Sequence, residues 1–325
     1  MKKTILFTLI IALVAVLCSC NMDAQDGIYS AIASSTKEST TKVKSYLGYY
    51  DNCYYILTDE SITRIGIGAV DFKSISAKGD IAVEAALLDD GSILVHRHNG
   101  GTIEKYDKDG KFALAYSDFA AINLMTNGTI LGTSGGVKGL YNSEGNLIKE
   151  ITNPRSVLES GDYTLVETTD GKMSIYKGSS LVSSGTVGSS SSYVTVGFEA
   201  VSDTEFYVLK EDAKVYSITA SSFESLTEYA KISYTLASSK NYSFHYTDSD
   251  GVKYVVFKVS ENFVKINLSD KTISTETLGY GSIRQNEVVN IMADYEDGQF
   301  IVATYSNYVW KIDPSDTSKD PVNIL

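Results

Sequence analysis

A short strand-and-turn pattern recurs along most of the chain, and this repeat constrains the fold more than any single motif. Its clearest copy spans residues 89–112, where Asp-Asp-Gly, Asn-Gly-Gly and Asp-Lys-Asp-Gly turns separate apolar runs around Ile93 and Ile103. Alternating apolar and polar residues predict strands, and Asn-Gly and Asp-Gly pairs supply the positive φ values that tight hairpins need. The repeat therefore predicts antiparallel meanders.

The copies can be aligned on an apolar or aromatic residue near the end of the third strand of each unit. These anchors recur every 35 to 48 residues, at Ile65, Tyr106, Tyr141, Tyr176, Ile218, Ile266 and Ile312. Four-stranded units of about 40 residues are typical of β-propeller blades. We therefore predict an all-β fold, a β-propeller of seven four-stranded blades, near residues 45–76, 79–117, 119–152, 155–187, 192–232, 240–278 and 286–325. Six or eight blades stay open because the first and sixth units are irregular.

Exposed edges explain why closure into a ring is the preferred interpretation. One four-stranded sheet has two open edges and too small a core to be stable alone. Packing such sheets face to face around an axis buries both faces of each and leaves only short, protected edges. Two separate β domains, or another β architecture such as an elongated solenoid, are the alternatives.

The first residues form a secretion signal and not part of that fold. Lys2 and Lys3 precede an uncharged, mostly apolar run over residues 5–17, which is too short for a transmembrane span of about 20 residues. The sequence Leu17-Cys18-Ser19-Cys20 resembles the lipobox of bacterial lipoproteins. That resemblance implies cleavage before Cys20 and acyl chains on its thiol and new amino terminus. A secreted protein without lipid, or acylation at Cys18, is the alternative.

These features divide the chain into a lipoprotein signal peptide at 1–19, a flexible Ser/Thr-rich tether at 20–44 and a β-propeller domain at 45–325. We expect a monomer in the bacterial cell envelope, lipid-anchored to the extracytoplasmic side of the inner or the outer membrane. The formal net charge of −12 disfavours nucleic acid and anionic lipid surfaces as partners. The membrane contact is therefore expected through the N-terminal acyl chains. After acylation only Cys53 is left, so no intramolecular disulfide can form.

Catalytic and metal-binding motifs are weak. His96 and His98 lie two apart, so both rings could face one metal on the same side of a strand. With only His245 elsewhere and no cysteine nearby, we interpret them as solvated histidines at a strand end. Asp107-Lys108-Asp109-Gly110 and Asp248-Ser249-Asp250-Gly251 lack the further acids of a calcium loop, and turn geometry explains them. We predict no metal, no cofactor and no catalytic residue set.

A candidate binding rim comes from the turn between the second and third strands of each unit, hereafter the second turn. In a four-stranded meander this turn lies on the same side as the connection to the next unit. Charged residues are frequent there: Asp59, Glu60, Arg97, His98, Asp170, Glu211, Asp212 and Glu261. We expect these residues to surround one mouth of the central channel and to bind a cationic or polar partner. The alternative is that hairpin turns simply favour such residues.

Residues 45–325 resemble the broad class of bacterial seven-bladed propeller lipoproteins with WD40-like or quinoprotein-like domains. The resemblance rests on repeat length and turn punctuation, and it implies the fold. The repeated tryptophans of quinone-dependent propellers are missing, since Trp310 is the single tryptophan. Propellers serve both binding proteins and enzymes. We therefore expect a non-enzymatic scaffold that recognises a protein or glycan; the alternative is a carboxylate-dependent enzyme acting on a polysaccharide or another polar extracytoplasmic substrate.

Overall fold

The computed structural model describes residues 42–66, 68–76, 83–186, 193–219, 227–233, 236, 242–259, 262–276, 288–294, 299–304, 308–313 and 321–324. The predicted signal peptide, Cys20 and nearly all of the predicted tether lie outside these residues. The regular structure of the described part consists of strands in seven four-stranded antiparallel sheets, and in every sheet the strands pair in chain order. Within this part no helix has the length and hydrophobicity needed to cross a bilayer.

The first four sheets contain strands β1 to β16. The first sheet has β1 (Val43–Tyr50), β2 (Cys53–Thr58), β3 (Ser61–Gly66) and β4 (Gly68–Ser76). The second has β5 (Val83–Leu87), β6 (Ile93–Arg97), β7 (Thr102–Tyr106) and β8 (Phe112–Ala115). The third has β9 (Phe119–Leu124), β10 (Ile130–Ser134), β11 (Val137–Tyr141) and β12 (Leu147–Glu150). The fourth has β13 (Pro154–Ser160), β14 (Tyr163–Thr168), β15 (Lys172–Lys177) and β16 (Ser180–Thr186).

The last three sheets contain strands β17 to β28. The fifth sheet has β17 (Thr195–Ser202), β18 (Glu205–Lys210), β19 (Lys214–Thr219) and β20 (Thr227–Lys231). The sixth has β21 (Ser243–Thr247), β22 (Lys253–Val259), β23 (Asn262–Asn267) and β24 (Ile273–Glu276). The seventh has β25 (Val288–Asp294), β26 (Gln299–Thr304), β27 (Val309–Ile312) and β28 (Val322–Asn323). Each predicted repeat coincides with one sheet to within a few residues, and the first strand begins two residues before the predicted start at 45.

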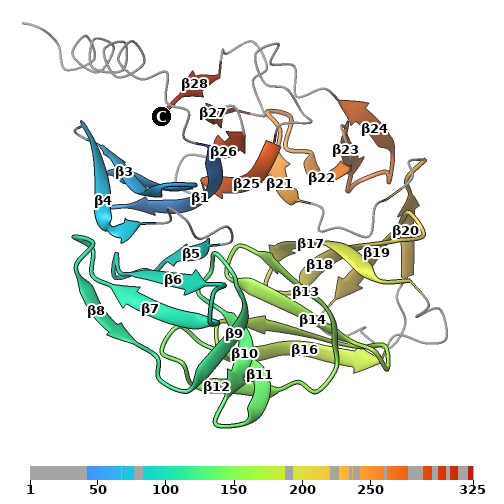
Figure 1. Cartoon of the computed structure of the whole chain (residues 1–325). Coiled ribbons are helices and arrows are strands. Elements are labelled where there is room, and N and C mark those ends of the chain that lie inside the picture. Colours follow the sequence, from blue (N-terminus) through green and yellow to red (C-terminus); the bar gives the residue numbers. More distant parts are fainter. Residues whose placement is uncertain are drawn as a thin grey trace, which may run out of the picture.

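The sheets surround a common centre (Figure 1). The first strand of each sheet lies near the axis and the fourth lies outside, as the labels of β5 and β8 illustrate. The first sheet lies beside the last, where β1 contacts β25 and β26. The chain is therefore an all-β β-propeller, as the repeats predict.

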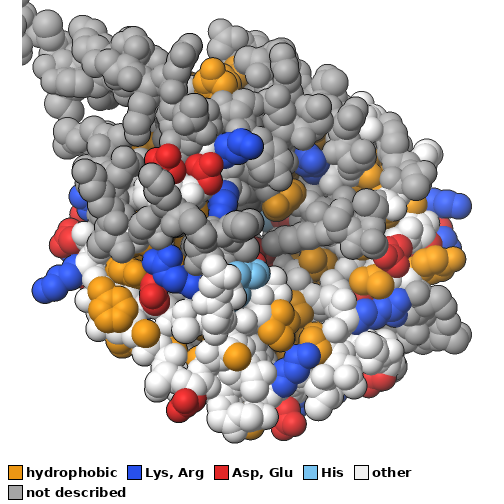
Figure 2. All heavy atoms as spheres, viewed as in Figure 1, with side chains coloured by type: hydrophobic (Ala, Val, Ile, Leu, Met, Phe, Trp, Pro, Cys, Tyr) orange, Lys and Arg blue, Asp and Glu red, His pale blue; other side chains and the backbone are white. Residues whose placement is uncertain are grey.

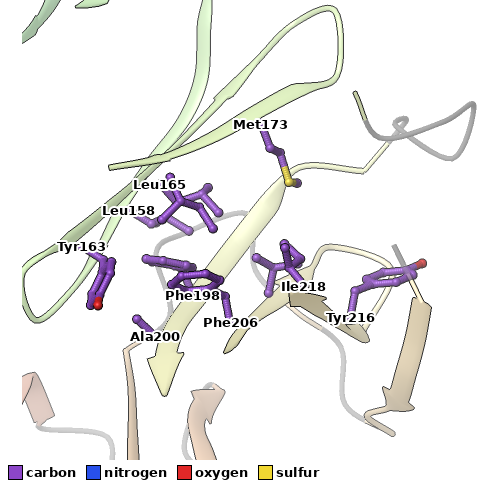
Figure 3. Packing of buried hydrophobic residues seen from close by; sticks show 11 residues of the cluster. Leu158, Tyr163, Leu165, Met173, Phe198, Ala200, Phe206, Tyr216 and Ile218 are labelled. Carbon is purple, nitrogen blue, oxygen red and sulfur yellow. The ribbon is translucent and has the colours of Figure 1, made fainter. Parts of the chain in front are cut away.

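Apolar clusters lie between successive sheets. One cluster joins the fourth and fifth sheets, where Leu158 and Leu165 meet Phe198 and Phe206 (Figure 3). Corresponding clusters join the other neighbouring sheets. Val309 of the last sheet packs with Val43, Tyr46 and Ile56 of the first, so burial is continuous around the ring.

A buried ion pair also joins the fourth and fifth sheets. Nζ of Lys210 lies 2.9 Å from Oε1 of Glu167, and the two side chains are 2% and 0% exposed. Oε2 of Glu167 accepts a hydrogen bond from the N–H of Thr195 at 2.8 Å, and Lys210 donates a second bond to the carbonyl of Tyr193. Both side chains therefore have the several hydrogen-bond partners that a buried ion pair requires.

The turn between β5 and β6 shows why one glycine of the clearest repeat is needed. Gly91 has φ of 78°, and a Cβ added there would lie 2.3 Å from Cε1 of Tyr50 in the first sheet. Gly251, in the corresponding turn between β21 and β22, has φ of 80° but no atom within 4 Å of an added Cβ. Gly91 therefore serves both the turn and the packing between sheets.

We predict that Lys210→Met lowers the free energy of unfolding by about 3–5 kcal/mol, because Glu167 is left as a buried unpaired charge. The matched control is Lys177→Met, which breaks the solvent-exposed bridge between Lys177 and Asp203 in the same pair of sheets. It should cost much less, because solvent-exposed ion pairs contribute little to stability. Urea unfolding at neutral pH measures the free energy of unfolding of both variants. Glu167→Gln combined with Lys210→Met should recover much of the stability that Lys210→Met loses. Equal costs for the two lysine variants would contradict this assignment.

We also predict that Gly91→Ala destabilises the protein more than Gly251→Ala. Both substitutions place alanine at a positive φ, at a cost of about 1–2 kcal/mol. Only Gly91→Ala also drives a methyl group into the Tyr50 ring, and such overpacking adds about 1–3 kcal/mol. Thermal unfolding of the two variants tests this difference; equal midpoints would show that Tyr50 moves away without cost.

Candidate binding site around the central cavity

A cavity of about 600 Å³ opens on the axis of the propeller. First strands β1, β5, β9 and β13 supply most of its lining, and Tyr242, just before β21, contributes from the other side. This volume falls within the range of small-molecule and peptide-anchor pockets, roughly 300–1,000 Å³. The cavity wall is therefore the best formed candidate site in the described part of the chain.

Three cationic side chains line the cavity at the end where the second turns lie. Lys44 and Arg155 come at the start of their first strands, whose opening residues pair with Thr58 and Thr168 directly before the second turns. Lys138 follows the second turn of the third sheet. Glu84 lies at the corresponding position of its own first strand, so three cations and one carboxylate line this end of the cavity.

Two carboxylates of the lining, Glu84 and Glu159, accept hydrogen bonds from the backbone of the third sheet. Oε2 of Glu84 accepts from the N–H of Leu124 at 2.6 Å, and Oε2 of Glu159 accepts from the N–H of Thr126 at 2.7 Å. The Thr126 hydroxyl donates to Glu159 as well. Both acids thus connect neighbouring sheets while facing the cavity.

The environment of Glu84 favours its charged form. Burial alone would raise the pKa of this carboxyl, but hydrogen bonds from His96 and from the Leu124 N–H outweigh burial and hold the pKa below its ordinary value. A general acid of a glycosidase needs the opposite shift, a raised pKa. Glu84 therefore fits a fixed anionic group in a binding wall better than a proton donor.

Five of the candidate rim acids lie in second turns of the described sheets. Asp59 and Glu60 lie between β2 and β3, Asp170 lies between β14 and β15, and Glu211 and Asp212 lie between β18 and β19. Glu261 lies outside the described residues. None of the described rim residues lines the central cavity; Asp170 instead lines a groove of about 250 Å³ beside β12.

Several rim acids already have structural partners. The carboxylate of Asp59 accepts from the N–H of Lys42 at 2.8 Å, and Glu211 accepts from the N–H of Val194 at 3.1 Å. Asp170 accepts from the hydroxyl of Thr168 and the N–H of Lys172 within its own turn. These bonds explain the acids as turn-stabilising groups, while Glu60 stays exposed.

The two basic rim residues of the second sheet have different surroundings. Arg97 pairs with Glu104 at 2.7 Å, so its charge is offset locally. Nε2 of His98 lies 4.0 Å from Oε2 of Glu84, and the His98 side chain is 41% exposed. His98 is therefore the rim residue that the structure brings close to the cavity wall.

The interpretation of His96 as a solvated histidine is wrong. The side chain of His96 is 1% exposed, because β6 is the second strand of its sheet and neighbouring sheets cover both faces. Its Nδ1 lies 2.9 Å from Oε2 of Glu84, the residue opposite it in the β5–β6 pairing. Sequence reasoning also missed Glu84, although the hairpin register around residues 88–92 places it opposite His96.

The two calcium-like sequences form ordinary turns. Oδ1 of Asp107 accepts the N–H groups of Asp109 and Lys111, and Oδ1 of Asp248 accepts those of Asp250 and Val252. Because one oxygen of each leading aspartate serves the backbone, turn geometry is a sufficient cause for these residues.

Comparisons with known proteins identify the fold of this chain and nothing beyond the fold. No family model matches the chain, and no curated protein matches it. Among solved structures, it is similar to PorZ, an essential bacterial surface component of the type-IX secretion system of Porphyromonas gingivalis, with a TM-score of 0.54 and 13% identity over 88% of this chain and 38% of that chain. The chain thus spans well under half of PorZ.

Two further structures have similar scores. Virginiamycin B lyase from Staphylococcus aureus gives a TM-score of 0.54 at 15% identity, over 84% of this chain and 95% of that chain. The extracellular domain of a putative one-component system from B. thetaiotaomicron gives 0.53 at 12% identity, over 85% and 39%. At these identities the likeness establishes the β-propeller fold alone.

Proposed function

We propose that this chain is a membrane-tethered extracytoplasmic lipoprotein, lipidated at Cys20, whose propeller binds a protein or glycan partner at the second-turn end of the central cavity. In this proposal each of the seven sheets is one blade. The observation that supports the binding role is the central cavity. Its size suits a ligand group, and Lys44, Lys138 and Arg155 line its mouth beside polar turns.

The charge arrangement indicates what such a partner presents. Three cationic side chains line the inside of the mouth beside the carboxylate of Glu84, and exposed acids such as Glu60 lie on the turns around it. A partner with a carboxylate or another anionic group can extend that group into the cavity, while its cationic or hydroxyl groups contact the turns. Acidic glycans and acidic protein segments both have this chemistry.

Two structural neighbours support the proposed location. PorZ is described as a bacterial surface component, and the one-component-system domain is described as extracellular. A propeller outside the cytoplasm fits the predicted signal and lipobox. The proposal of a binding role is supported by the interlocking hydrogen bonds of Glu84 and Glu159, which fix both carboxylates against the neighbouring sheet.

The anchor is tested by membrane fractionation of the full chain. We predict that Cys20→Ala moves the protein from the detergent-extracted membrane fraction to the soluble fraction, because the acyl chains are lost. Cys18→Ala is the matched control and should leave the protein in the membrane fraction. If Cys18→Ala released the protein and Cys20→Ala did not, the lipidation site would be Cys18.

The binding surface is tested by affinity capture of the full chain from its own envelope. We predict that Lys44→Glu combined with Arg155→Glu reduces capture of the partner at least about tenfold, a loss of about 1.4 kcal/mol. The control, Lys108→Glu combined with Lys253→Glu, makes the same charge change on exposed residues at the opposite ends of their sheets. Full capture by the cavity variant would exclude this mouth as the binding surface, and Glu60→Lys then tests the turns.

A further inference from the structure

We propose that Glu84, His96 and His98 form a binding site for a zinc-like divalent transition-metal ion in the wall of the central cavity. One possible ligand atom from each residue lies within 4.8 Å of the other two, and no other such group of three occurs among the described residues. The proposal requires neither the lipid anchor nor the partner proposed above.

The distances fit an ion after a small adjustment. Oε2 of Glu84 lies 2.9 Å from Nδ1 of His96 and 4.0 Å from Nε2 of His98. Zinc bonds of about 2.0–2.2 Å place neighbouring ligand atoms of a tetrahedral ion about 3.3–3.5 Å apart. The distances from Glu84 to the two imidazoles lie on either side of that value, and the ligand atoms of the two histidines lie within 4.8 Å of each other.

The surrounding structure orients two of the three ligands. His96 is buried in β6 and faces Glu84 in the strand register. The Glu84 carboxylate is held from the next sheet by the N–H of Leu124 at 2.6 Å and by the side-chain amide of Asn123 at 3.3 Å. Hydrogen bonds of this kind to a ligating carboxylate fix its orientation and strengthen metal binding.

The third ligand can move. His98 is 41% exposed, and its ring centroid lies 4.5 Å from that of His96 with an interplanar angle of 32°. The two rings therefore already lie side by side, and rotation of the exposed His98 ring can shorten the 4.0 Å separation. Glu84 lines the cavity, so a fourth position on the ion would face solvent and could hold water or a group of a partner.

Nδ1 of His96 already faces Glu84 at 2.9 Å without any contribution from His98. A purely structural pair at this position does not need a second imidazole two residues later.

The chemistry of the ligands selects the kind of ion. Two imidazoles and one carboxylate suit zinc, copper or nickel, whereas calcium and magnesium require oxygen ligands in larger number. The ligand set contains no thiolate, so the site should exchange its metal in the presence of strong chelators.

The chain also contains a natural control. Nδ1 of His245 lies 2.7 Å from Oε1 of Glu199, which is a histidine–glutamate pair like that of His96 and Glu84. No third ligand joins Glu199 and His245 in the described part of the chain. The complete sequence has three histidines, so His245 is the single histidine outside the proposed site.

The test is zinc binding by the full chain in detergent, purified without a polyhistidine tag and freed of metal by a chelator. We expect one zinc ion per chain in titration calorimetry and in competition with a chromogenic chelator. His98→Gln should weaken binding at least about tenfold without unfolding the protein, because His98 is exposed. His245→Gln should leave the affinity unchanged.

Two further readouts separate a metal site from a structural role. Zinc should raise the thermal midpoint of the wild-type chain and of His245→Gln, but not that of His98→Gln. Cobalt bound to the wild type should give the visible absorption of a low-coordinate nitrogen and oxygen site, lost in His98→Gln. Absence of stoichiometric zinc binding to the wild type, or equal zinc affinity in His98→Gln, would overturn the proposal.

Discussion

The fold depends on burial of the sheet faces between successive sheets, which requires that the last sheet pack on the first. Val309 of β27 meets Val43, Tyr46 and Ile56 of the first sheet, and Lys311 reaches the Tyr54 hydroxyl at 3.5 Å. Without this contact, two apolar faces would be left in water. Since burial contributes about 25 cal/mol per Å², closure converts seven marginal sheets into one stable body.

The sequence predicts this ring because its signal is local and repeated. Turns such as that at Gly91 and anchors such as Tyr106 appear in each unit, and hairpin formation depends on residues close in sequence. The candidate site is harder to predict from the sequence than the fold. The alternation of apolar and polar residues assigns each residue to a face of its strand. Which residues lie next to the central axis depends on how the whole ring closes. The sequence alone therefore does not show that Lys44 and Arg155 line the cavity.

Buried charges were missed for a related reason. Glu167 and Lys210 are 43 residues apart, and each sits in a strand whose sequence looks like any half-polar strand. Their pairing arises between two sheets, so it is absent from the pattern of either one. Glu84 and His96 are different, because they share a hairpin whose turn is obvious. Their register was predictable in principle, while the bond from Leu124 in the next sheet was not.

Several polar bonds between sheets come from carboxylates of the first strands. Glu84, Glu159 and Glu199 all lie on first strands and bond to a neighbouring sheet or to the loop beside it. Glu84 and Glu159 also line the cavity. A ligand or ion that binds Glu84 must therefore act on the contact between the second and third sheets, and its binding free energy becomes part of the stability of the ring.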